Sequence, residues 1–255
     1  MKIIISPAKK MHIDEETFSV LSEPVFVEEA GKIKDRLKAM SREELKKLWK
    51  CSDELTDQNI ERLKSMELHS NLSAAISSYE GIQYQYMSPR TLESDALTYL
   101  DKHLRIISGF YGIVSPFDGV REYRLEMQAL LKFEDKKNLY DFWGSRICDY
   151  IIEEDLKSDE DEVIINLASE EYSKAVLPYI NGRVRCVSIS FLKLTDKGLK
   201  KQATLQKMAR GEMVRYMAVH KITDIDSLKA FNGLGFEFCE EMSDESNLIF
   251  IKKNI

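Results

Sequence analysis

The chain has 255 residues, of which 44% are hydrophobic and 31% are charged. This composition is typical of a folded globular protein and excludes a disordered chain, and no run approaches the ~18 apolar residues that a membrane-spanning helix needs. The formal net charge is −6, so polyanions are repelled on average and any anion site must be a local basic patch.

Hydrophobic periodicity and turn residues predict the elements of the first half of the chain. In chain order they are a buried strand at 2–6, three helical segments within 24–66, a strand at 74–81, a helix at 88–103 and a strand at 104–112 that breaks at Gly109. Ser41, followed three residues later by Glu44, predicts a capping box at the start of the second helical segment. The short apolar run KIII is too small for the core of a signal peptide, so we expect a cytoplasmic protein.

The second half alternates helices and strands before it ends in a hairpin. The predicted elements are a helix at 138–156, a strand at 162–169, a helix from Ser169, a strand at 183–194, a helix at 197–219, a short helix at 222–231 and paired strands at 236–242 and 247–253. We therefore predict one α/β (mixed α+β) domain over residues 1–255. It has a mixed central sheet surrounded by helices and a C-terminal antiparallel hairpin.

Three predicted strands end in a serine followed by charged or aromatic residues: Ser6, Ser108 and Ser169. If these strands are parallel neighbours, the serines meet at one edge of the sheet, where open α/β sheets bind their ligands. Lys9 and Lys10 would then enter the same region. Alternatively, the serines are turn formers and helix caps, and the lysines are solvated surface residues.

A second candidate region is the charged segment SPFDGVREYRLEM at 115–127. Its alternation from Glu122 onward is compatible with a strand that places Arg124 and Glu126 on one face. The fork of donors on Arg124 suits a carboxylate or a phosphate, and Glu126 suits a base or a salt partner of the arginine. A surface ion pair is the simpler explanation.

A third candidate region is the basic segment 193–221. Helical spacing predicts an apolar face that includes Leu205, Met213 and Met217 and leaves a cationic face opposite. The proposed anion-binding residues of this segment are Lys197, Lys200, Lys201, Lys207, Arg210 and Arg215. An ordinary solvated helix face remains the alternative. Gly233 and Gly235 weakly suggest the hairpin of a helix-hairpin-helix DNA module, but the predicted strand after them argues against it.

No established cofactor or metal motif is recognised in the sequence. The four cysteines and four histidines are scattered, without C-x-x-C or H-E-x-x-H spacing. A nucleotide-binding glycine loop and a G-x-S-x-G nucleophile elbow are also not found. We therefore expect no cofactor and no metal site, and no enzyme class can be assigned.

Taken in order, the short motifs of the chain resemble the YaaA family of bacterial peroxide-stress proteins. The motifs are Ile5–Lys9, Ser108–Gly112, Pro116 with Asp118, Tyr123–Met127, Phe142–Gly144, Asn166–Tyr172 and Ala209–Arg215. The resemblance implies a cytosolic protein that protects bacteria from hydrogen peroxide and is linked to limiting free iron. It also implies one globular domain whose positively charged cleft binds double-stranded DNA.

Three functional hypotheses follow. In the first, a cleft lined by Lys9, Arg124 and the basic residues of 197–215 binds double-stranded DNA. In the second, the same cleft is an enzyme site for a small phosphate- or carboxylate-bearing substrate, with Lys9, Tyr123 and Glu126 as catalytic candidates and a deep pocket. The third, direct iron binding, ranks last because the sequence has no ligand cluster. We expect no membrane partner and favour a monomer.

Overall fold

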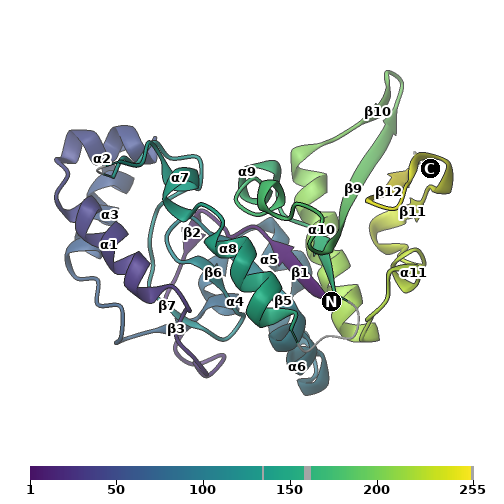
Figure 1. The fold of residues 1–255 in the computed structure, drawn as a ribbon, viewed down its shortest axis with the longest axis horizontal. Helices are drawn as coiled ribbons and strands as arrows, with labels where there is room; N and C mark the ends of the chain where they lie inside the picture. The colour runs from purple at the N-terminus through teal and green to yellow at the C-terminus, as the bar shows by residue number, and fades with distance from the viewer. Residues whose placement is uncertain (134, 158–161, 254–255) are drawn as a thin grey trace.

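A central mixed sheet organises the computed structural model, which describes residues 1–133, 135–157 and 162–253 (Figure 1). Its strand order is β11-β12-β9-β8-β1-β5-β6, with β10 paired to β9. The strands are β1 (Lys2–Ile5), β5 (Leu104–Ser108), β6 (Gly112–Val114), β8 (Val163–Asn166), β9 (Arg185–Thr195), β10 (Gly198–Lys200), β11 (Phe236–Phe238) and β12 (Asn247–Lys252). β5, β1, β8, β9 and β12 are parallel neighbours, whereas β6, β10 and β11 pair antiparallel. The predicted mixed sheet and C-terminal hairpin are confirmed.

The middle strands are buried along their whole length, because helices cover both faces of the sheet. Ile3, Ile4 and Ile5 are all inaccessible to solvent, as expected for a parallel strand that carries a continuous apolar run. In Figure 1, α8 (Arg146–Tyr150) crosses the near face of the sheet, while α5 (Ile82–Met87) and α6 (Ser94–His103) lie behind it. One connected hydrophobic core includes residues from both faces.

The remaining elements are short, apart from one long helix. They are α1 (Val27–Lys38), α2 (Arg42–Trp49), α3 (Asp53–Lys64), α4 (Ala75–Ser78), α7 (Leu139–Trp143), α9 (Glu170–Ser173), α10 (Ala203–His220), α11 (Ile225–Leu228), η1 (Pro89–Thr91), η2 (Ile151–Asp155), η3 (Leu177–Tyr179), η4 (Gly233–Gly235) and η5 (Glu240–Met242). Two small ladders pair β2 (Lys10–Met11) with β4 (Tyr79–Glu80) and β3 (Ser73–Ala74) with β7 (Gly119–Val120). In the described ranges, no helix is both long and apolar enough to cross a bilayer.

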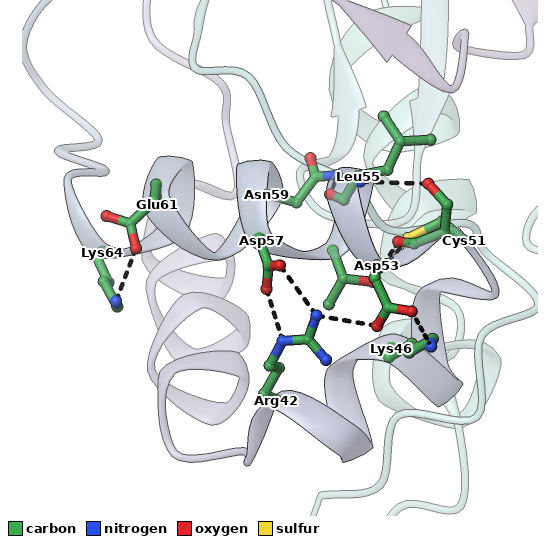
Figure 2. Close-up of polar contacts among 11 residues, drawn as sticks. Arg42, Lys46, Cys51, Asp53, Leu55, Asp57, Asn59, Glu61 and Lys64 are labelled. Carbon is green, nitrogen blue, oxygen red and sulfur yellow. Dashed lines mark hydrogen bonds and ion pairs between the residues drawn. The ribbon is translucent and has the colours of Figure 1, made fainter.

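The three helices within 24–66 form a bundle at one end of the molecule (Figures 1 and 2). The predicted capping box is confirmed, since Ser41 Oγ accepts from Glu44 N and the Glu44 carboxylate accepts from Ser41 N. Figure 2 shows Arg42 of α2 bridging Asp53 and Asp57 of α3. These exposed pairs orient α2 against α3 at a modest gain in stability.

The strand predicted at 74–81 is wrong in its middle, although residue 74 lies in β3 and residues 79–80 form β4. Residues 75–78 form a helical turn because the hydroxyls of Ser77 and Ser78 donate to Ala74 O. The backbone N–H groups of Ala75 and Ile76 donate to Asp118 O and to the carbonyl of 116. Serine hydroxyls that satisfy a nearby carbonyl compete with strand pairing, and the sequence pattern did not reveal this competition.

Several predicted helices are shorter than expected, because short non-helical stretches interrupt them. The helix at 88–103 divides into η1 and α6 because Leu92 and Glu93 between them have an extended backbone, and that at 138–156 breaks at Gly144, with φ 53°. The helix at 197–219 starts only at residue 203, since Gly198, with φ 87°, turns β9 back into β10. Residues 122–127 form no strand.

Candidate functional site

The carboxyl ends of the parallel strands bring two of the predicted serines into contact. β1 lies between β5 and β8, as the strand-end hypothesis required. The backbone N–H of Ser169 donates to Ser6 Oγ at 2.8 Å, and the Ser6 hydroxyl lies 3.2 Å from Ser169 Oγ. From α5, the Tyr84 hydroxyl donates to the carbonyl oxygen of Ser6 at 3.0 Å. We call this edge of the sheet the strand-end site.

The third serine, Ser108, is fully buried beneath the strand-end site. Its Oγ accepts from the backbone N–H groups of Phe110 and Tyr111 and lies 2.7 Å from the hydroxyl of Tyr123. That hydroxyl in turn lies 2.9 Å from the hydroxyl of Tyr79. Burial raises the pKa of Tyr123 to about 12. The Tyr123 hydroxyl therefore stays protonated at neutral pH, and hydrogen bonds hold it and Ser108 in place beneath the site.

Lys9 and Arg124 meet at one carboxylate. Glu126 Oε1 lies 3.1 Å from Lys9 Nζ and 3.2 Å from an Nη atom of Arg124. The Lys9 side chain is 63% exposed, while those of Arg124 and Glu126 are 17% and 12% exposed. Gly109 lets this segment approach closely, since a Cβ there would lie 2.8 Å from Leu125 O. The two predicted cations thus share a single oxygen.

Sequence reasoning missed Glu171 and Tyr172, which complete the strand-end site. Burial raises the pKa of Glu171, the charge of Glu126 raises it further, and Lys9 opposes both effects. Tyr172 is buried and lines, with Lys9 and Glu126, a hollow of about 10 Å³. Both residues lie in the motif Asn166–Tyr172, but helical spacing could not indicate which of two consecutive glutamates faces inward.

Arg210 lies on α10 rather than in direct contact with Lys9 or Arg124. The following residue, Gly211, packs against the backbone of α5, whose Tyr84 contacts Ser6. The Arg210 side chain is partly buried and has neither an ion pair nor a hydrogen bond within the described residues, and its Nε is a buried donor without an acceptor. Burial lowers the pKa of Arg210. The alternative of a fully solvated Arg210 is therefore wrong, while its place in the predicted anion-binding cleft stays a prediction.

A projecting hairpin carries the exposed lysines of the third region (Figure 1). This hairpin, the link that follows it and the first two turns of α10, here together called the basic arm, present Lys197, Lys200, Lys201 and Lys207. All four are exposed, and within the described ranges none has a carboxylate within ion-pairing distance. The charge of Lys201 lowers the pKa of Glu170 in α9, after the larger effect of Lys174. The base of the basic arm therefore faces the helix that follows Ser169.

Two predicted anion-binding residues are engaged elsewhere. Lys10 pairs with Glu80 at 2.6 Å, in the ladder between β2 and β4. Arg215 donates to the hydroxyl of Thr91 at 2.8 Å and to Ser88 O at 3.2 Å, which satisfies the carboxyl end of α5. The structure thus places Lys10 and Arg215 outside the strand-end site.

No metal ligand set is found in the part of the chain that the structure describes, where no three histidine, cysteine or acidic side chains gather. The four cysteines are free thiols. Gly233 and Gly235 lie in η4 and are followed by β11. A helix-hairpin-helix module is therefore not formed there.

Comparison with known proteins gives a family match over almost the whole chain. The family described as "Peroxide stress protein YaaA" matches residues 1–242. A UPF0246 protein of Lachnoclostridium phytofermentans is 48% identical over 252 residues, which cover 99% of this chain and 96% of the relative. UPF0246 proteins of Desulfitobacterium hafniense and Lactiplantibacillus plantarum are 46% and 44% identical, and the alignments cover 98% or more of every chain compared. The chain belongs to the peroxide stress protein YaaA family.

Proposed function

We propose that this protein acts in peroxide stress by binding double-stranded DNA through the basic arm and the adjoining cations of the strand-end site. The observation that carries the proposal is the set of four exposed lysines without ion-pairing carboxylates on a protein of net charge −6. Such lysines bind phosphates without sequence preference, and binding releases counterions. The proposal includes a monomer in the cytoplasm, where the chromosome is accessible.

The geometry supports a surface ligand better than a small enclosed substrate. The hollow beside Lys9 and Glu126 has a volume of only about 10 Å³, roughly the space that a single water needs. The hydroxyl of Tyr123, a candidate for proton transfer, is already shared with Ser108 and Tyr79. An enzyme acting on a small anion would need this hollow to open.

The salt dependence of DNA binding tests the proposal. We expect a random duplex to bind at low salt and the Lys200→Gln/Lys201→Gln variant to bind more weakly. Because each lost phosphate contact removes about 0.9 from the slope of log affinity against log salt, that slope should fall by about 2. Fluorescence anisotropy over a salt series measures both quantities.

The matched control is Lys46→Gln/Lys64→Gln, which also removes two positive charges but acts in the helical bundle, where both lysines are ion-paired (Figure 2). Its slope should stay within experimental error of the wild-type slope. Failure of the wild-type protein to bind any duplex at low salt refutes the proposed function. Equal losses in the two double variants would refute the assignment to the basic arm.

The proposed link to iron is indirect and consists in the protection of DNA. Bound protein would screen the duplex from the hydroxyl radicals that free ferrous iron makes from peroxide. Supercoiled plasmid treated with ferrous iron and peroxide should therefore be nicked several-fold more slowly with saturating wild-type protein. The Lys200→Gln/Lys201→Gln variant, at the same concentration, should protect less. Equal nicking with and without the wild-type protein would contradict this role.

A further inference from the structure

The carboxylate of Glu126 occupies the position between two cations that an anionic ligand would need. A single oxygen, Oε1, lies within ion-pairing distance of both Lys9 Nζ and an Nη atom of Arg124. A guanidinium and an ammonium that converge on one oxygen form the arrangement typical of phosphate recognition. The Nε of Arg124 is also buried without an acceptor. A larger oxyanion at this position could satisfy that donor as well.

The charges around this position cancel in the free protein. The loop after β1 contributes Lys9, and the segment before Met127 contributes Arg124 and Glu126. α9 contributes Glu171, whose pKa responds to both Glu126 and Lys9. Two cations therefore face two carboxylates, so an approaching phosphate finds no net attraction until one carboxylate moves away.

We propose that the position of Glu126 Oε1, between Lys9 and Arg124, is a subsite for a phosphate oxyanion. In the free protein, the carboxylate of Glu126 occupies this subsite. A ligand phosphate displaces the Glu126 carboxylate and takes over both cations. This inference rests on the proposed function, because it places one phosphate of the bound ligand. Anions that bind weakly or are small do not displace the Glu126 carboxylate, so they are excluded from the subsite.

The surroundings of Glu126 allow this exchange. Within the described ranges, Lys9 and Arg124 are the hydrogen-bonding or ion-pairing partners of its carboxylate. Its backbone lies outside helices and strands, while Gly109 holds that backbone against the sheet edge. A rotation of the Glu126 side chain therefore vacates the subsite without unfolding any helix or strand. With the carboxylate in place, the hollow of about 10 Å³ cannot hold a phosphate.

The experiment compares the wild-type protein with Glu126→Gln, which keeps the shape of the side chain but removes its charge. Two probes distinguish the sources of phosphate: a random duplex, followed by anisotropy, and inorganic pyrophosphate, followed by calorimetry. We expect Glu126→Gln to bind the duplex about fivefold more tightly, as expected when an ion pair that competes with the ligand is removed. Glu126→Asp, which keeps the charge on a shorter side chain, should show a smaller gain.

Matched controls separate this local effect from a general change of charge. Glu61→Gln removes the same charge from the helical bundle, where Glu61 pairs with Lys64 (Figure 2), and should change affinity by less than twofold. In a Lys9→Met background, the gain from Glu126→Gln should shrink, because one of the two released cations is gone. A gain that persists there in full would overturn the subsite.

The outcomes also separate the subsite from the proposed function. If the wild-type protein binds the duplex and Glu126→Gln binds it no more tightly, the subsite is refuted and the proposed function stands. If neither protein binds the duplex but Glu126→Gln binds pyrophosphate more tightly than wild type, the subsite stands and the DNA proposal fails. If neither protein binds either probe, both are refuted.

Discussion

Replacing Gly211 with alanine is expected to lower the free energy of unfolding by about 3 kcal/mol, because the new methyl group has no room between two packed helices. A Cβ at this position would collide with the carbonyl oxygen of Gln83 and would lie 2.9 Å from Met87 N. Both atoms belong to the backbone of α5, which cannot move aside as a flexible side chain can. Urea denaturation followed by circular dichroism measures the change as a lower midpoint.

The same substitution in another helix serves as the control and has the opposite sign. Gly31 lies in α1, and a Cβ there would meet only a terminal methyl of Leu68, at 3.9 Å. Because alanine is favoured over glycine in a helix interior, Gly31→Ala should stabilise the protein by about 0.5–1 kcal/mol. A neutral or stabilising Gly211→Ala would show that α10 does not pack on α5 as described.

The sequence predicted the strands of the sheet well, because their signal is local. Ile3, Ile4 and Ile5 form a run that only a buried parallel strand accommodates, and a serine marks its end. The segment around Ser77 and Ser78 escaped prediction because its fold depends on distant partners. Backbone groups there are satisfied by the chain near Asp118, and no pattern within eight residues encodes that pairing.

The candidate site was predictable only in part. Parallel neighbours bring strand ends together, so Ser6, Ser169 and Lys9 could be grouped from the sequence. Arg124 belongs to the separate charged segment 115–127, which the strand ends alone do not place. The inward position of Glu171 depends on how α9 is oriented on the sheet, which spacing alone does not fix. Helical spacing placed Arg210 on the cationic side of α10, but spacing could not show that this side chain is partly buried or that Gly211 lets the backbone of α5 approach this part of the helix closely.

A buried ion network lies at the amino ends of β1 and β5, at the other end of these strands from the strand-end site. Asp155, at the end of η2, accepts from Nε and an Nη atom of Arg105 at 2.6 Å each and lies 3.5 Å from Lys2 Nζ. The side chains of all three residues are at most 9% exposed. The network therefore joins the helix on one face of the sheet to the first residues of β1 and β5.

Removing the charge of Asp155 should be among the most damaging single changes in the molecule. In Asp155→Asn, the guanidinium of Arg105 stays buried while the side chain that accepts from its Nε and Nη atoms loses its charge, and breaking a buried pair in this way costs about 3 kcal/mol. Asp149→Asn is the matched control, because Asp149 lies on the same helical segment as Asp155 but forms an exposed ion pair. Its carboxylate lies 2.7 Å from Arg183, and both side chains are about one third exposed. That change should cost less than about 1 kcal/mol. Urea midpoints compare the two variants, and equal losses would mean that solvent already screens the Asp155 network.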